Sequence, residues 1–291
     1  PAEATSAYLQ HLLEGLPLFG PMADTKLFPR KKFEASLSLD ELRALGEWAV
    51  LSTQSHDFSC GDPDVSAELW RLTLEECAED RREARGPFTL AQMRERHPRG
   101  FVPAIRFPVV QKAVRPCDEY SRFGHNGTSE LEESVDPEGP DCIVGLSKAW
   151  ASACLDGKTV RVTLADGTVL TGTLHVSFRG DDCGNLRCRI VDLRRAYKQL
   201  RRRPDLADLA VFALMNPDGE VVFFEATAVA FGARNAVNGF NVHARAIRFL
   251  ATSALWLVLS HFFDDFCQVE HTRVAESGAS SLTRLMTLLG W

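Results

Sequence analysis

The sequence contains no long apolar run, which excludes one class of protein. No stretch approaches the roughly 18 apolar residues that a membrane-spanning helix needs, so we expect no membrane partner. The N-terminus has neither the basic segment nor the apolar core of a secretion signal, which predicts an intracellular protein of the nucleus or cytoplasm. At 291 residues and 45% hydrophobic composition, the length allows one large globular domain or two ordinary ones, and the oligomeric state stays open.

Closely spaced cysteine pairs are also lacking. The eight cysteines include no Cys-x-x-Cys pattern, and the nearest pair is Cys183 and Cys188. We interpret them as the scattered reduced thiols of an intracellular protein. A zinc site built from His56, Cys60 or this cysteine pair is the less favoured alternative.

An excess of positive charge is lacking, and the charge is unevenly distributed. The formal net charge of −6 argues against nucleic acid as a partner, although the distribution matters more than the sum. Residues 118–142 contain eight acids and one arginine, and we predict a mobile acidic loop over 124–141. Residues 194–203 contain six Lys or Arg and no acid, so a contact with nucleic acid at this stretch stays open.

Local patterns predict an α+β fold. Residues 1–99 are expected to form a mainly helical N-terminal region with a support or interaction role, including a helix that begins with the capping-box pattern at Thr89. From residue 100 onward, β-branched and aromatic residues become frequent. The elements predicted there are edge-like strands over 101–111, a helix over 144–155, a hairpin over 159–176, a strand over 186–191, a hairpin over 206–230, a helix over 235–255, a strand over 258–263 and a helix over 276–289.

Two of the predicted strands end in carboxylates. Asp192 ends one, and Asp264 with Asp265 ends another, 72 residues downstream of Asp192. Oxygen ligands at one end of paired antiparallel strands suit Mg²⁺ or Mn²⁺, and two such ions serve phosphoryl transfer to a 3′-hydroxyl. Adjacent aspartates also occur in helical diphosphate-handling enzymes, but a DDxxD box requires an acid at position 268, which is Gln268.

The order and spacing of these segments resemble the reverse transcriptases, a family of palm-type polymerases. The resemblance covers about residues 100–291. The segments that carry it are Gln111-Lys112-Ala113-Val114-Arg115-Pro116-Cys117-Asp118 (a fingers strand), Asp192-Leu193-Arg194-Arg195-Ala196-Tyr197-Lys198-Gln199-Leu200 (the first catalytic motif), 222–236 with its strand ending in Phe-Gly-x-x-Asn-Ala (the second motif), Phe262-Phe263-Asp264-Asp265 (the Tyr-x-Asp-Asp box) and the helix ending at Leu288-Leu289-Gly290-Trp291 (the fourth motif).

The resemblance implies an α+β, palm-type polymerase fold with an antiparallel sheet backed by helices. Fingers are expected over about 100–180 and 201–232, and palm over about 181–200 and 233–291. The implied enzyme is an RNA-directed DNA polymerase that uses an RNA or DNA template with a primer and deoxynucleoside triphosphates. Three departures qualify it: Phe262 stands where the family usually has Tyr, the segment before Asp192 is long, and the chain ends at Trp291, before the family's thumb. We therefore expect this fragment to bind nucleotide yet polymerise poorly.

The resemblance also assigns roles to the acidic residues. Asp192 and Asp264 would be catalytic and would ligate both metal ions, Mg²⁺ or Mn²⁺. Asp265, the second aspartate of the box, would be a less essential partner in the same site. The alternatives are a strand-end cap for Asp192 and an exposed turn for Asp264 and Asp265.

Five residues would bind the nucleotide. The Tyr197 ring would lie under the sugar and clash with a 2′-hydroxyl, which favours deoxynucleotides. Arg115 and Lys112 would bind the triphosphate through charge-assisted hydrogen bonds. Phe231 and Gly232 would border the nucleotide. The alternatives are a core aromatic for Tyr197, a surface cation for Lys112 and a plain turn at 231–232.

The basic stretch would contact template phosphates without reading bases. The candidates are Arg194, Arg195, Lys198 and Arg201, followed by Arg202 and Arg203. Because residues directly after a strand end cannot all face one way, only some of them are expected to touch nucleic acid; a solvated basic face is the alternative. A second hypothesis for the whole chain is a decayed or domesticated polymerase-like module that binds nucleic acid or protein without catalysis.

Overall fold

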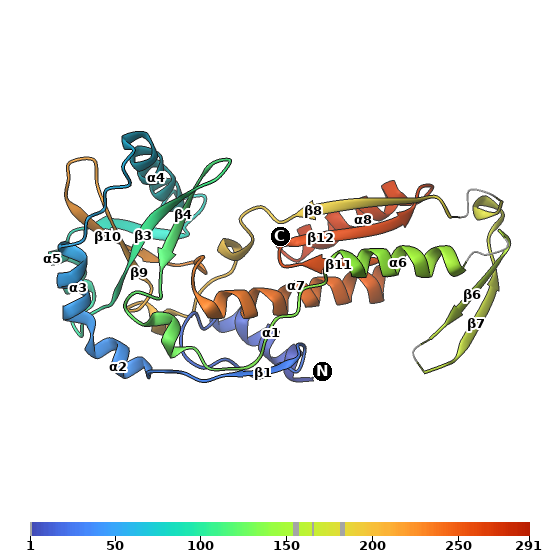
Figure 1. The fold of residues 1–291 in the computed structure, drawn as a ribbon, viewed down its shortest axis with the longest axis horizontal. Helices are drawn as coiled ribbons and strands as arrows, with labels where there is room; N and C mark the ends of the chain where they lie inside the picture. The colour runs from blue at the N-terminus through green and yellow to red at the C-terminus, as the bar shows by residue number, and fades with distance from the viewer. Residues whose placement is uncertain (1, 154–156, 165, 181–183) are drawn as a thin grey trace. The chain divides into compact units, whose positions relative to one another are not determined.

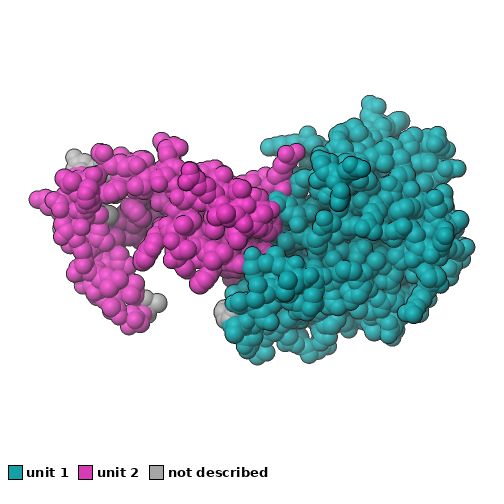
Figure 2. All heavy atoms as spheres, turned by 180° about the vertical axis from the view of Figure 1, so that it is seen from behind, with its two compact units in different colours: residues 1–135, 195–242 teal, residues 136–194, 243–291 magenta. Residues whose placement is uncertain are grey.

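A computed structural model describes residues 2–153, 157–164, 166–180 and 184–291. They form an α+β fold with antiparallel and mixed sheets, as the sequence predicts. The fold divides into two units (Figure 2): unit 1 comprises residues 1–135 and 195–242, and unit 2 comprises residues 136–194 and 243–291. Within the described residues, no helix is both long enough and apolar enough to cross a membrane.

Figure 1 shows the order of the elements along the chain. The α-helices are α1 (Ala2–Glu14), α2 (Leu39–Ala44), α3 (Gly46–Gln54), α4 (Pro63–Glu76), α5 (Leu90–Arg96), α6 (Pro140–Ala153), α7 (Arg234–Leu255) and α8 (Ala275–Leu288). The strands are β1 (Arg30–Phe33), β2 (Ala84–Phe88), β3 (Pro103–Val110), β4 (Val114–Glu119), β5 (Leu131–Glu133), β6 (Thr159–Thr163), β7 (Val169–Thr173), β8 (Leu186–Asp192), β9 (Val211–Met215), β10 (Val221–Ala226), β11 (Leu259–Phe262) and β12 (Asp265–His271).

The elements predicted beyond residue 140 are confirmed, with shifted ends. The helices correspond to α6, α7 and α8, the hairpins to β6–β7 and β9–β10, and the strands over 186–191 and 258–263 to β8 and β11. Contrary to the prediction, Asp264 and Asp265 do not end β11: β11 ends at Phe262, and Asp265 begins β12, an unpredicted strand that lies between β11 and β8. The capping box at the start of α5 is present as well, since the Thr89 hydroxyl accepts from Gln92 N and the Gln92 side chain accepts from Thr89 N. Alternating patterns and helix caps depend only on neighbouring residues, which explains why the elements predicted from them are present in the structure.

A five-stranded sheet in the order β2-β10-β9-β3-β4 organises unit 1. Its neighbouring strands are antiparallel except β3 and β9. Both faces are covered, which makes β9 and β10 buried along nearly their whole length. On one face Phe223 packs with Val50 of α3 and Met93 of α5, and on the other Phe224 stacks on Phe212 and meets Trp70 of α4 edge-on.

The first hundred residues do not form a separate region. Their strand β2 pairs with β10, so residues 1–99 and residues 195–242 belong to the same unit. Strand β2 was not predicted, because the dipeptide Gly86-Pro87 usually interrupts regular secondary structure. At the edge of the sheet, however, the missing N–H of Pro87 costs no ladder bond, and a Cβ on Gly86 would lie 2.5 Å from the Phe224 ring.

Strand β3 was predicted to be edge-like because of its two prolines, yet it lies between β9 and β4. Its pairing with β9 covers only Pro103 to Ile105, while its pairing with β4 extends to Val110. Pro108 therefore lies where β3 has one neighbouring strand, which explains how an interior strand accommodates it.

The acidic tract 124–141 is folded, so the prediction of a mobile loop is wrong. Its strand β5 pairs with β1. The buried Glu133 carboxylate accepts hydrogen bonds of 3.0–3.2 Å from three backbone N–H groups between Thr25 and Phe28. A prediction from composition treats every acidic residue as solvated, whereas Glu133 accepts hydrogen bonds from buried donors of a distant segment.

A three-stranded antiparallel sheet in the order β11-β12-β8 organises unit 2. Once β9 and β10 of unit 1, which lie between β8 and α7 in the chain, are left out, β8, α7, β11, β12 and α8 give a β-α-β-β-α order, as in the first five elements of the β-α-β-β-α-β pattern. Helix α8 packs closely on β12, since a Cβ on Gly278 would lie 2.8 Å from Gln268 Nε2. Helix α6 also packs against β12.

The outer edge of β11 is covered by a carboxylate. Glu138 N donates to His261 O at 3.3 Å, and Glu138 Oε2 accepts from His261 N at 3.2 Å. The same carboxylate is paired with Arg245 and Arg248 of α7. These contacts anchor the second half of α7 beside the strand that leads to the predicted box.

A buried charge cluster lies between α4, β3 and β4 in unit 1. The Arg106 side chain is 1% exposed, donates twice to Asp118 at 2.8 and 3.0 Å and lies 3.5 Å over the Phe212 ring. Arg106 also donates to Glu76 at 2.8 Å, and Glu76 pairs with Lys198. Burial alone would raise the pKa of Glu76, but these two cations lower it to about 2.

Glu76→Gln should strongly destabilise unit 1. Removing one partner of a buried ion pair leaves uncompensated charge and typically costs about 3–5 kcal/mol. Urea unfolding combined with hydrogen exchange of β9 and β10 would measure the loss. Glu68→Gln, which removes an exposed carboxylate from the same helix, is the matched control; equal effects of the two variants would contradict a structural role for the cluster.

The stability of unit 1 should decline in acid. Glu76 has a folded pKa of about 2, below its ordinary value of 4.5, so its contribution is complete above pH 4.5 and is lost as the pH falls towards 2. Urea midpoints measured between pH 6 and pH 3 should fall for the natural chain. They should fall less steeply for Glu76→Gln, and parallel slopes would rule out this residue as the cause.

Candidate metal centre

Strands β8 and β12 place two carboxylates opposite each other. In their register Asp192 is the direct partner of Asp265, and the next pair inward is Val191 with Phe266. Directly opposed residues of antiparallel strands have side chains on the same face. The register therefore brings Asp192 and Asp265 together, and the fully buried Phe266 anchors β12 beside them.

Asp264 lies in the two-residue turn between β11 and β12. Its backbone O accepts a hydrogen bond from Leu193 N at 3.3 Å, which ties the turn to the end of β8. The other turn residue, Phe263, has φ 52°, a left-handed conformation that a bulky residue rarely adopts. Such strain often marks functional sites, and no sequence pattern singled out Phe263. All three predicted metal ligands thus lie at one end of one sheet.

The electrostatics of the pair favour a cation. Asp192 and Asp265 are both exposed, and neither carboxylate has a hydrogen bond or ion pair with any residue that the structure describes. Two like charges opposite each other repel, so a bound cation would stabilise them. In the described parts of the chain no three His, Cys, Asp or Glu side chains enclose a metal ion. The pair fits Mg²⁺, which often takes one or two carboxylates and completes its shell with water and substrate phosphates.

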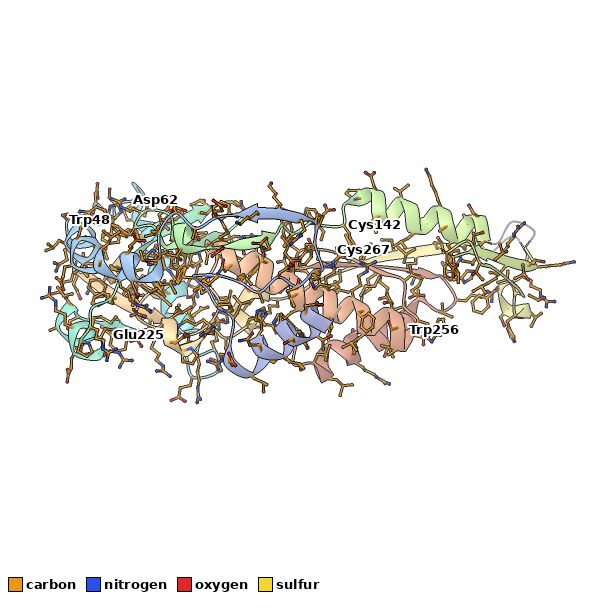
Figure 3. All side chains as sticks on the ribbon, turned by 90° about the horizontal axis from the view of Figure 1, so that it is seen from below. Trp48, Asp62, Cys142, Glu225, Trp256 and Cys267 are labelled. Carbon is orange, nitrogen blue, oxygen red and sulfur yellow. The ribbon has the colours of Figure 1, made fainter. Side chains whose placement is uncertain are left out.

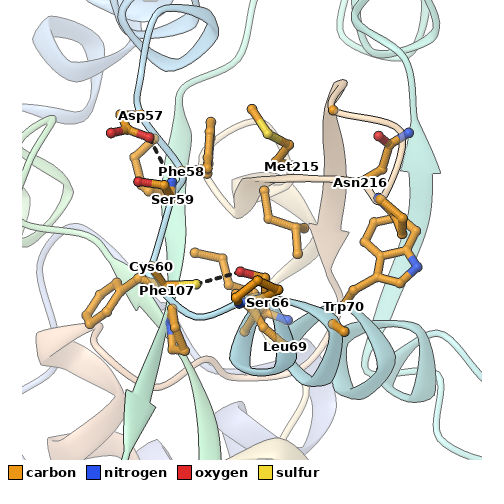
Figure 4. A pocket seen from close by; sticks show the side chains of 18 of the residues that line it. Asp57, Phe58, Ser59, Cys60, Ser66, Leu69, Trp70, Phe107, Met215 and Asn216 are labelled. Atoms are coloured by element: carbon orange, nitrogen blue, oxygen red, sulfur yellow. Dashed lines mark hydrogen bonds between the residues drawn. The ribbon is translucent and has the colours of Figure 1, made fainter.

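The alternative zinc ligands lie elsewhere. His56 and Cys60 line an apolar cavity of about 530 Å³ in unit 1, which Figure 4 shows from close by. There Cys60 Sγ and Ser66 Oγ are 2.7 Å apart and form a hydrogen bond. Of the other pair, Cys183 lies outside the described residues, and Cys188 Sγ is 3.0 Å from Cys267 Sγ. Burial raises the pKa of Cys267 to about 12, which keeps it protonated and a poor metal ligand.

The predicted sugar-contacting ring is packed among aromatics in unit 1. Tyr197 stacks on Phe240 with ring centroids 4.7 Å apart and lies 4.9 Å from Phe231. Tyr197 is 7% exposed, whereas Phe231 is 39% exposed. The structure therefore brings two of the predicted nucleotide residues together, with Phe231 on the open side of the cluster.

Gly232 has a packing reason to be glycine. Its φ is 98°, and a Cβ there would lie 2.2 Å from Asp118 O. The Asn126 side chain also donates to Gly232 O at 2.9 Å. Three residues later, Asn235 donates to Pro17 O and Gly20 O. These contacts explain the Phe-Gly-x-x-Asn pattern through close packing of the chain.

The two predicted triphosphate ligands lie in and beside the β3–β4 hairpin turn. Lys112 is in the turn itself, and Arg115 is on β4 opposite Val109. Both are exposed and have no partner among the described residues. Their charges are therefore available to a ligand of unit 1.

The basic stretch is divided between internal and surface roles. The Lys198 side chain is 10% exposed and paired with Glu76. The prediction that Lys198 contacts template phosphates is therefore wrong, and its role is structural. Arg195, at φ 64°, pairs with Glu83. Arg194 and Arg201 are exposed and remain candidates for contact with nucleic acid. The sequence could not separate these roles because the partners are more than a hundred residues away.

Comparison with protein-family models and with curated proteins finds no match for this chain. The functional assignment therefore depends on the residues themselves and on their placement.

Asp265→Asn should raise the melting temperature in the presence of a chelator, because it removes repulsion with Asp192. The same variant should lose the rise in melting temperature that Mg²⁺ or Mn²⁺ gives the natural chain, because one of the two opposed carboxylates is gone. Thermal scans with and without the ion measure both effects. Asp218→Asn, in the exposed β9–β10 turn, should behave like the natural chain, and an ion response retained by Asp265→Asn would exclude this site.

Proposed function

We propose that the chain is the fingers and palm portion of an RNA-directed DNA polymerase, which adds deoxynucleotides to a primer 3′-end. The observation that carries the proposal is the register that sets Asp192 opposite Asp265, with Asp264 in the adjoining turn. The β-α-β-β-α order of β8, α7, β11, β12 and α8, interrupted by β9 and β10 of unit 1, supports it. The match of motif order over residues 100–291 supports it independently.

Asp192 and Asp265, whose carboxylates are exposed, would hold two divalent ions together with the half-buried Asp264. Bound there, Mg²⁺ would lower the pKa of the primer 3′-hydroxyl and neutralise charge on the triphosphate and the leaving pyrophosphate. Asp192 and Asp265 form the directly opposed pair, and Asp264 lies one residue away at the strained Phe263 turn. The opposition of Asp265 to Asp192 gives this second aspartate a larger expected role than the resemblance alone assigns.

Residues of unit 1 would recognise the nucleotide. Arg115 and Lys112 have unpaired charges that suit a triphosphate. Tyr197 is held rigidly by Phe240, so a ribose 2′-hydroxyl that met the ring could not displace it easily. A rigid ring supports selection of deoxynucleotides over ribonucleotides.

Single-nucleotide addition to a primed RNA template, with Mg²⁺ or Mn²⁺, tests the catalytic proposal. Asp192→Asn should abolish addition while retaining the circular dichroism of the natural chain, because Asp192 is exposed and has no protein partner among the described residues. Asp218→Asn, a matched exposed aspartate, should add normally. Addition that survives Asp192→Asn would refute the proposal. Oligonucleotide binding without any addition would instead support the decayed-module alternative.

Tyr197→Ala should increase the incorporation of ribonucleotides relative to deoxynucleotides. The physical reason is steric, since the ring and not its hydroxyl would exclude the 2′-oxygen. Tyr197→Phe preserves the ring and should keep the natural selectivity. Competition assays with paired nucleotides measure the ratio, and an unchanged ratio in Tyr197→Ala would assign the ring to packing alone.

A further inference from the structure

A groove rich in arginine lies in unit 1, built from elements that carry none of the predicted metal ligands. It encloses about 680 Å³. We call it the arginine groove; the residues used to define it are Leu12, Leu13, Arg85, Arg96, Arg201 and Arg202. The exposed Leu12 and Leu13 of α1 form an apolar rim.

Backbone contacts between three distant segments fix the groove. Leu16 N donates to Arg201 O at 2.8 Å, and Arg202 N donates to Thr227 O at 3.2 Å. At Gly15, φ is 89° and a Cβ would lie 2.6 Å from Arg202 O, so only glycine permits this approach. The arginines at 201 and 202 are therefore held in place by the main chain.

The buried carboxylate of the groove is already neutralised. Glu225, labelled in Figure 3, accepts from Arg96 at 2.6 and 2.9 Å and is 2.8 Å from His97 Nε2. Burial would raise the pKa of Glu225, but the hydrogen bonds from His97 and Arg96 lower it to about 2. Arg85 is the direct cross-strand partner of Glu225 on β2, but no hydrogen bond or ion pair joins the two side chains.

Two guanidinium groups of the groove have no carboxylate partner among the described residues. Arg85 is exposed without a side-chain contact, and Arg201 donates only to Arg82 O at 3.4 Å. Arg202 is only 9% exposed, donates to the backbone O atoms of Ala226 and Arg203, and has its charge partly offset by Glu225. Four arginines against the two carboxylates that line it, Glu14 and Glu225, make the groove locally positive in a chain of net charge −6.

We propose that the arginine groove binds the phosphodiester backbone of a nucleic-acid strand. Guanidinium groups bind phosphate oxygens in a planar, bidentate geometry, and these groups line a recess that a strand can enter but a flat bilayer cannot. No Phe, Tyr or Trp lines the groove as described, so it offers no surface for base stacking, and binding is independent of sequence. The proposal holds whether or not the chain polymerises.

The test is anisotropy of a fluorescent single-stranded oligonucleotide titrated with the full chain in chelator at several salt concentrations. Arg85→Gln with Arg201→Gln should weaken binding and reduce the slope of log K against log salt by about 0.7 for each lost phosphate contact. Arg71→Gln, which removes an exposed arginine of α4 outside the groove, should match the natural chain. Arg85→Lys with Arg201→Lys should keep most of the salt-dependence slope of the natural chain, because lysine preserves the positive charge.

Three outcomes would overturn the proposal. One is unchanged affinity and slope in the double Gln variant, with natural circular dichroism. The second is loss of tripolyphosphate binding in that variant while oligonucleotide binding persists, which would assign the groove to free polyphosphate. The third is that phosphatidylserine vesicles bind through the two arginines and the oligonucleotide does not. The titration is made in chelator and measures binding alone, whereas nucleotide addition tests the polymerase proposal, so failure of either proposal would be seen separately.

Discussion

The antiparallel register of β8 and β12 is the constraint on which the candidate centre depends. Side chains alternate between the two faces of a sheet, so a slip of one residue would move Asp192 away from Asp265. The half-buried Val191 and its fully buried partner Phe266 hold the register against the repulsion of the two carboxylates. An apolar pair thus stabilises an arrangement that the charges alone would oppose, and the strained turn at Phe263 completes it.

In unit 1, some charged side chains are paired inside the fold and others are left free to bind a ligand. Carboxylates that are buried, such as Glu76, Glu133 and Glu225, each satisfy several donors from segments distant in sequence. Cations left over from these pairs lie on the surface, at the β3–β4 turn and in the arginine groove. Net charge is therefore a poor guide to partners here, because internal pairing removes charges selectively from the surface.

Much of the fold beyond residue 140 could be predicted, and much before it could not. Helix α7 and the hairpins carry their signals within a few residues, as period, turn or cap. Strand β2 carries no such signal, because Gly86-Pro87 is tolerated only at a sheet edge that the rest of the chain provides. The prediction of a mobile loop over the acidic tract 124–141 was wrong for a related reason, since the donors that Glu133 satisfies lie more than a hundred residues away.

For the candidate site, the sequence alone determined that Asp192 ends a strand, that Asp264 and Asp265 follow a second strand closely, and that Tyr197 lies five residues after Asp192. Only the tertiary structure decided that Asp265 is the residue opposite Asp192, that Lys198 is buried against Glu76, and that Arg85 and Arg201 line one groove. The physical reason is that strand ends and periodicity are local properties of the chain. Register, burial and charge pairing depend on which distant segments meet.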